Sequence, residues 1–135
     1  MRTRTRLLVL MLAAVVGLLV TGAALAITGL TFNNTAPLSV NNTEATMTGT
    51  VTCDPTDLSV RLFAEIIQGK GRQFIVGSGS ETEACPVGGG TISWTIVLQA
   101  STGETFQKGS ATASVSASGD TNGLDEIGPI KLTSK

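Results

Sequence analysis

Histidine and tyrosine are both absent from this chain of 135 residues, and cysteine occurs only twice. Without histidine, no Ser-His-Asp triad can form, and no G-x-S-x-G motif is present. The glycine-rich GKGR and VGGG stretches lack the spacing of a phosphate-binding loop. Carboxylate pairs, Glu81 with Glu83 or Asp54 with Asp57, are the remaining candidates for acid–base chemistry. We therefore expect a protein that is not an enzyme and has no cofactor.

The chain opens with the order of a secretory signal peptide. Three arginines lie among the first six residues, an uncharged apolar run follows over 7–20, and small residues end in an A-x-A triplet at 24–26. We expect this signal helix, residues 1–26, to direct secretion and to be removed. An uncleaved anchor is the alternative, since 7–26 is just long enough to span a bilayer.

Removal of the signal changes the charge balance. Three of the nine basic residues leave with it, so six remain against ten acidic ones, a net charge of −4. An acidic domain lacks the basic face that nucleic acid requires. No linker or repeat divides residues 27–135, which are expected to form a single domain. We expect no nucleic-acid partner and, after signal cleavage, no membrane partner; the oligomeric state is left open.

Cys53 and Cys85 both lie after the signal. An even number of cysteines in an exported chain indicates a disulfide, and two cysteines allow only one intramolecular pair. A metal site would need more ligands, and a redox pair would prefer C-x-x-C spacing. We predict a structural Cys53–Cys85 bridge that stabilises the fold by about 3–4 kcal/mol.

Apolar and polar residues alternate with a period of two after residue 27, which predicts strands. The clearest strands are expected over 45–53, 58–68, 91–100 and 109–118, with shorter ones at 72–80, 81–86 and 127–132 and a first strand broken around 33–37. Proline and glycine interrupt the pattern at DPTD, GKG and VGGG, where turns are expected. No stretch after residue 26 has a helical period.

About seven to nine short strands at intervals near ten residues predict an all-β fold, an immunoglobulin-like antiparallel β-sandwich. The last strand, 127–132, is expected at a sheet edge. Trp94 lies on the inward side of a strand with clear alternation, and its large side chain is expected to fill the core. Its predicted neighbours are Val51, Val60, Leu62, Ile96 and Val115.

The segments GTVTC (49–53) and GSATASVSA (109–117), together with Cys85 and Trp94, resemble small exported bacterial immunoglobulin-like domains of unknown function, in actinobacterial-type families. The resemblance covers roughly residues 44–118. It implies a sandwich architecture and an export route. It implies no activity and no functional residues.

The segment GDTNGLDE is the one candidate for a metal site, namely calcium. Asp120, Asn122, Asp125 and Glu126 offer oxygen ligands, and Gly123 permits a sharp turn. The order of an EF-hand loop is not met, and asparagine and aspartate are also common turn residues. We expect a turn that holds no metal.

Phe63 and Ile67 lie on the outer side of the strand over 58–68, with Glu65 between them and Arg61 beside them. Two interpretations are open. Either loops cover this strand on both faces, or the pair forms an exposed apolar strip that binds a partner.

From these features we expect a secreted or cell-envelope domain that acts as a binding or structural module, with an unidentified protein or envelope component as its partner. The alternative is a small enzyme inhibitor that presents the loop around Cys85, residues 78–90. Retention in the envelope would favour the module, and free secretion with resistance to proteases would favour the inhibitor.

Overall fold

The structure, a computed structural model, describes residues 28–120 and 123–135 of the chain. The predicted signal, residues 1–26, lies outside the described residues. The elements are eight strands: β1 (Thr28–Phe32), β2 (Thr35–Leu38), β3 (Glu44–Cys53), β4 (Ser59–Lys70), β5 (Gln73–Ala84), β6 (Gly90–Ala100), β7 (Gly109–Ser118) and β8 (Gly123–Ser134). Among the described residues, no helix is long and apolar enough to cross a membrane.

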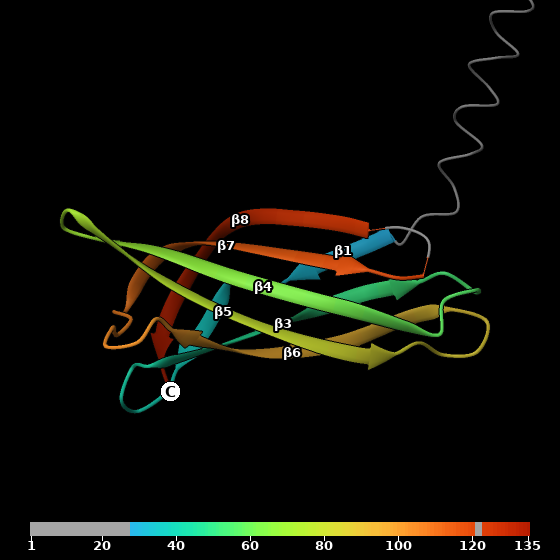
Figure 1. Ribbon diagram of the computed structural model, residues 1–135, viewed down its shortest axis with the longest axis horizontal. Helices are drawn as coiled ribbons and strands as arrows, with labels where there is room; N and C mark the ends of the chain where they lie inside the picture. Colours follow the sequence, from blue (N-terminus) through green and yellow to red (C-terminus); the bar gives the residue numbers. More distant parts are fainter. Residues whose placement is uncertain (1–27, 121–122) are drawn as a thin grey trace, which may run out of the picture.

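The strands form one sheet that closes on itself (Figure 1). Around the ring, β3 pairs with β2, β2 with β8, β8 with β7, β7 with β4, β4 with β5, β5 with β6, and β6 again with β3. Seven strands therefore make a closed β-barrel, and β1 pairs with β3 as an additional strand. The all-β prediction is confirmed, but the predicted immunoglobulin-like sandwich is wrong.

The error has a physical reason. Alternation shows which face of a strand is buried, but it does not show how the outermost strands pair. Here a stretch of only two residue pairs closes the barrel between β5 and β6: Gly77 and Ser78 pair with Ala100 and Gln99. A glycine inside a strand permits a tight bend at a barrel corner, and a Cβ atom at Gly77 would overlap the ring of Phe106.

The first strand is broken, as predicted, and the break is a change of partner. β1 runs antiparallel to β3, whereas β2, after Asn33 and Asn34, runs parallel to the end of β8. β8 pairs with β7 from Gly123 to Leu132 but with β2 only from Lys131 to Ser134, so the edge strand expected over 127–132 is seen for 127–130, which pair on one side, and is wrong for 131–132, which pair on both. The two short strands expected over 72–86 are one strand, β5.

The core fills the barrel interior. Trp94 is 1 % exposed, and all five neighbours predicted for it belong to the same buried cluster. Phe106 closes the end of the barrel near the β6–β7 loop. Gln68, also buried, fixes that loop: its side-chain oxygen accepts a hydrogen bond from the Gln107 amide at 2.8 Å, and its nitrogen donates to the Gln107 carbonyl at 2.7 Å.

Beyond Ser78, β5 keeps its pairing with β4 but no longer pairs with β6. In this part of β5, Glu81 and Glu83 lie opposite Leu62 and Val60 in the register with β4. Both neighbours are buried core residues. The two glutamates therefore lie on the side of the sheet that elsewhere forms the core.

Candidate functional site

The outer face of β4 carries two exposed apolar side chains at the positions singled out in the sequence. Phe63 is 49 % exposed and Ile67 is 39 % exposed. β4 lies between β5 and β7, so its backbone is paired on both sides here (Figure 1). Of the two interpretations left open, the structure therefore agrees with an exposed strip at the centre of a paired sheet.

Two further apolar side chains extend this strip. Val76 of β5 lies directly opposite Ile67, and Ile127 of β8, 72 % exposed, lies two strands away on the same outer face. We name Phe63, Ile67, Val76 and Ile127 the outer apolar patch. The sequence indicated the outward position of Ile67 but not the register that places Val76 opposite it and Ile127 level with Glu65, two strands away.

The surroundings of the outer apolar patch are hydroxyl-rich. Arg61 has Thr82 and Ser118 as cross-strand neighbours, and Glu65 has Ser78 and Ser114. An open hollow of about 520 Å³ lies beside Phe63. Apolar side chains at the centre with hydrogen-bonding groups around them are the arrangement found at protein–protein interfaces.

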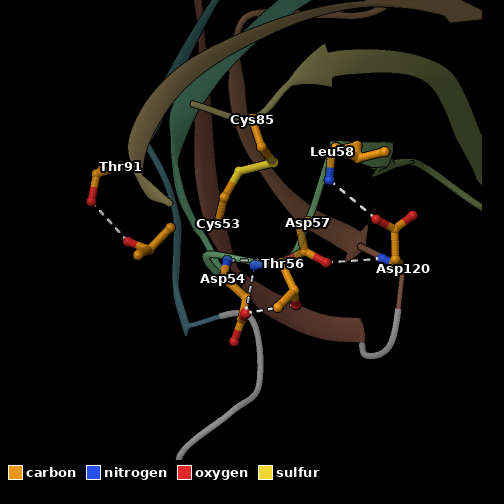
Figure 2. Close-up of a disulfide and its surroundings, with 9 residues drawn as sticks. Cys53, Asp54, Thr56, Asp57, Leu58, Cys85, Thr91 and Asp120 are labelled. Atoms are coloured by element: carbon orange, nitrogen blue, oxygen red, sulfur yellow. Dashed lines mark hydrogen bonds between the residues drawn. A yellow bond between two sulfur atoms is a disulfide. The ribbon is translucent and has the colours of Figure 1, made fainter. Parts of the chain in front are cut away.

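The predicted disulfide is present at one end of the barrel (Figure 2). Cys53 at the end of β3 is joined to Cys85, which follows β5, with their Cα atoms 5.9 Å apart. The Cys85 amide also donates a hydrogen bond to the carbonyl of Leu58 at 3.0 Å. The bridge and this hydrogen bond therefore tie two connections of the barrel together, the one between β3 and β4 and the one between β5 and β6.

Beside the bridge, the candidate carboxylate pair Asp54 and Asp57 accepts hydrogen bonds from backbone amides. Asp57 is 3 % exposed; its Oδ1 accepts from the Asp120 amide at 3.0 Å and its Oδ2 from the Asp54 amide at 3.1 Å (Figure 2). Asp120 in turn accepts from the Leu58 amide at 3.1 Å. Asp54 accepts from the amide and the hydroxyl of Thr56, and these hydrogen bonds lower the pKa of Asp54.

The candidate calcium residues do not converge on one point. Asp125 and Glu126 are successive residues of β8, so their side chains leave opposite faces of the strand. Gly123 begins that strand. Asp120 is engaged with Leu58, and Asn122 lies outside the described residues. Within the described part of the chain, no group of three or more acidic, cysteine or histidine side chains could hold a metal ion.

The loop proposed for an inhibitor is shorter than expected. β5 continues to Ala84, so only residues 85–89 of the expected segment 78–90 form a loop. Val87 at its tip is fully exposed. Gly88 and Gly89 have φ angles of 84° and 81°, which favour glycine. The loop is thus small and is held at its base by Cys85.

No family model matches this sequence, and no curated protein matches it either.

Proposed function

We propose that this chain is a noncatalytic binding module that works outside the reducing interior of the cell. The outer apolar patch on β4, β5 and β8 is its partner-binding surface, and the partner is a protein or another component of the cell envelope. The exposure of Phe63 and Ile67 on the part of β4 that is paired on both sides carries this proposal.

The Cys53–Cys85 bridge supports the location. Disulfides form and persist in oxidising compartments, and this one joins elements of the folded barrel. The predicted signal at residues 1–26 would supply the export route. The origin of the chain in an exported bacterial family is part of the same proposal.

The rigidity of the site supports the function. β4 at Phe63 and Ile67 is paired on both sides, so this part of the binding surface changes little when a partner arrives, and little conformational entropy is lost on association. Phe63 supplies a large ring with few rotatable bonds, which suits it to an anchor in the partner's surface. No candidate acid–base pair lies in the patch, which favours binding over catalysis.

The test is a capture experiment with the exported form, residues 27–135. The domain is immobilised and exposed to the envelope fraction and the culture fluid of its own organism. We expect a component that is retained by the native domain and lost with Phe63→Glu. Val97→Glu is the matched control, because Val97 is also half-exposed, at 46 %, but lies on β6 outside the patch. Equal retention by both variants would contradict the proposal.

The inhibitor remains a second candidate because of one observation, the fully exposed Val87 on a disulfide-held loop. In this case an extracellular enzyme would bind Val87, and the domain would resist proteolysis. Val87→Asp would then abolish binding while Phe63→Glu would not. The opposite result would leave only the outer apolar patch.

A further inference from the structure

The fold gathers the cationic side chains at the end of the barrel away from the disulfide. This cationic end consists of the β4–β5 turn, the β6–β7 loop and the last residues of β8. The exposed cations there are Lys70, Arg72, Lys108, Lys131 and Lys135. Of the cationic residues that the structure describes, only Arg61 lies elsewhere, near the start of β4.

Acidic side chains gather at the opposite end, beside the disulfide. They are Asp54, Asp57, Glu81, Glu83, Asp120 and Asp125, and Glu126 lies nearer the middle of the barrel, level with Ala64. Two acids share the cationic end: Glu104, and Glu44, which accepts a hydrogen bond from Gln99 at 2.6 Å. Glu65 lies at the middle of β4. One end is therefore positive in an otherwise acidic domain.

The two ends are far enough apart to act separately. β4 has 12 residues and at about 3.3 Å per residue spans about 40 Å. Salt screens exposed charges beyond about 8–10 Å at physiological ionic strength. An anionic surface that approaches the cationic end is therefore attracted, although the net charge of residues 28–135 is negative.

Apolar side chains protrude among these cations. The turn between β4 and β5 reaches beyond the neighbouring strands (Figure 1), and residues 69–74 are all exposed. Phe74 is 73 % exposed and lies two residues after Arg72; it pairs with Gly69, so its side chain leaves the opposite face of this hairpin from that of Lys70. Val40, in the β2–β3 loop at the same end, is 95 % exposed.

A hollow of about 270 Å³ at this end joins both kinds of group. Lys108 and Lys135 line it together with the hydroxyl-bearing Ser39 and Ser134, and Val40 forms part of its wall. The two lysines and the Ser134 hydroxyl are suited to a phosphate, because charge-assisted hydrogen bonds to its oxygens are strong; the Ser39 hydroxyl is already engaged, since it donates to Asn41 Oδ1 at 2.8 Å.

We propose that the cationic end docks on the surface of an anionic lipid bilayer. A headgroup phosphate occupies the hollow between Lys108 and Lys135. Lys70 and Arg72 contact neighbouring headgroups, and Phe74 reaches the boundary with the acyl chains. The sequence, where the cations are scattered over 70–135, led us to expect no membrane partner after signal cleavage, and this proposal replaces that expectation. It does not depend on the outer apolar patch.

A lipid surface fits better than a soluble anionic polymer. A polymer would need the cations alone, and exposed Phe74 and Val40 would add nothing to its binding. At a bilayer, an aromatic ring and cations that project from the same turn both gain, because the ring leaves water while the ammonium groups stay with the phosphates.

The test is co-sedimentation of residues 27–135, which contain every strand and the whole core, with vesicles. Vesicles of equal parts phosphatidylglycerol and phosphatidylcholine are expected to bind the domain, and vesicles of phosphatidylcholine alone are not. The double variant Lys70→Glu with Arg72→Glu should lower the partition coefficient by about tenfold or more. Lys108→Glu and Phe74→Ser should each lower it several-fold, and added salt should release the protein.

Arg61→Glu is the matched control, because it changes the net charge as Lys70→Glu does and lies on the same strand. We expect Arg61→Glu to bind like the native domain while Lys70→Glu binds less. Equal binding by these two variants, or no binding to anionic vesicles, would overturn the proposal. Capture by soluble polyphosphate but not by vesicles, with no effect of Phe74→Ser, would replace the bilayer with a polymer.

Discussion

Gly49 of β3 lies directly opposite Trp94 of β6 in the antiparallel register of the two strands. A Cβ atom at Gly49 would lie 2.5 Å from Cζ2 of Trp94 and 2.8 Å from the Cα atom of Phe32 in β1. The indole therefore packs over a position without a side chain, and β1 passes close to the same position. Room for the largest side chain of the core depends on this glycine.

Gly49→Ala is expected to destabilise the domain by about 3 kcal/mol, because the new methyl group overlaps both the indole and the backbone of β1. Urea unfolding of the exported form measures the change. Gly69→Ala is the matched control: it is also a strand glycine, but the nearest atom to its added Cβ is 4.0 Å away. Equal loss in the two variants would show that overlap with Trp94 is not the cause.

Trp94→Ala is expected to cost about 3–5 kcal/mol through the cavity that it leaves. Trp94→Phe should cost much less, because it leaves a smaller cavity. It also removes an indole N–H that has no hydrogen-bond partner among the described residues. Because Trp94 is the one tryptophan of the chain, its fluorescence reports on the core alone. Native emission should be blue-shifted and should move red on unfolding; red native emission would contradict the burial.

Replacement of both cysteines by alanine, at positions 53 and 85, is expected to lower the free energy of unfolding by about 2–5 kcal/mol. The unfolded chain gains freedom once the two ends of this loop are no longer joined. Peptide mapping of the folded protein without reductant should recover one Cys53–Cys85 link. Two free thiols in the folded protein would contradict the bridge.

Asp57→Ala is expected to cost about 2–3 kcal/mol, because the amides of Asp54 and Asp120 lose their acceptor in a buried site. Thermal unfolding would measure the loss. Asp125→Ala removes the same group from an exposed position on β8 and should change the stability by less than about 0.5 kcal/mol. A similar loss in both variants would rule out the hydrogen bonds as its origin.

Titration of Asp54 should show a pKa below the ordinary value for aspartate, since the amide and hydroxyl of Thr56 hydrogen-bond to the carboxylate. The folded pKa is thus below the unfolded one. Its contribution to stability is fully present above the unfolded pKa and is lost as the pH falls through the folded pKa. Carboxyl chemical shifts measure it, and Thr56→Val, which keeps only the amide, should raise the pKa part of the way back.

Alternation was sufficient to identify most of the strands and the faces that they bury, although β5 was expected as two strands. The burial of Trp94 and the outward position of Phe63 both follow from a period of two along a single strand. The Cys53–Cys85 pair followed from the number of cysteines. The direction of a side chain depends only on its own strand, and two cysteines allow only one pair. Both properties can therefore be predicted without knowing the fold.

Closure into a barrel could not be read in the same way, because it depends on which strands meet at the corners. The pairing of Gly77 with Ala100 involves two residues without distinctive chemistry. Assembly of the candidate sites has the same origin: Val76 and Ile127 join Phe63 only through register, and Lys70 and Lys135 reach one end only through topology. Asp57 was identified as a carboxylate, but its amide partners depend on a contact with Asp120 across 63 residues.

Residues 79–84 of β5, which pair with β4 but not with β6, bear on aggregation at high protein concentration. A strand that lacks a neighbour can recruit one from another copy, which is the first step toward sheet-mediated aggregation. Glu81 and Glu83 lie opposite Leu62 and Val60 and therefore point to the side of the sheet that elsewhere forms the core. Charged side chains that point inward from an unpaired edge disfavour the recruitment of a strand from another copy.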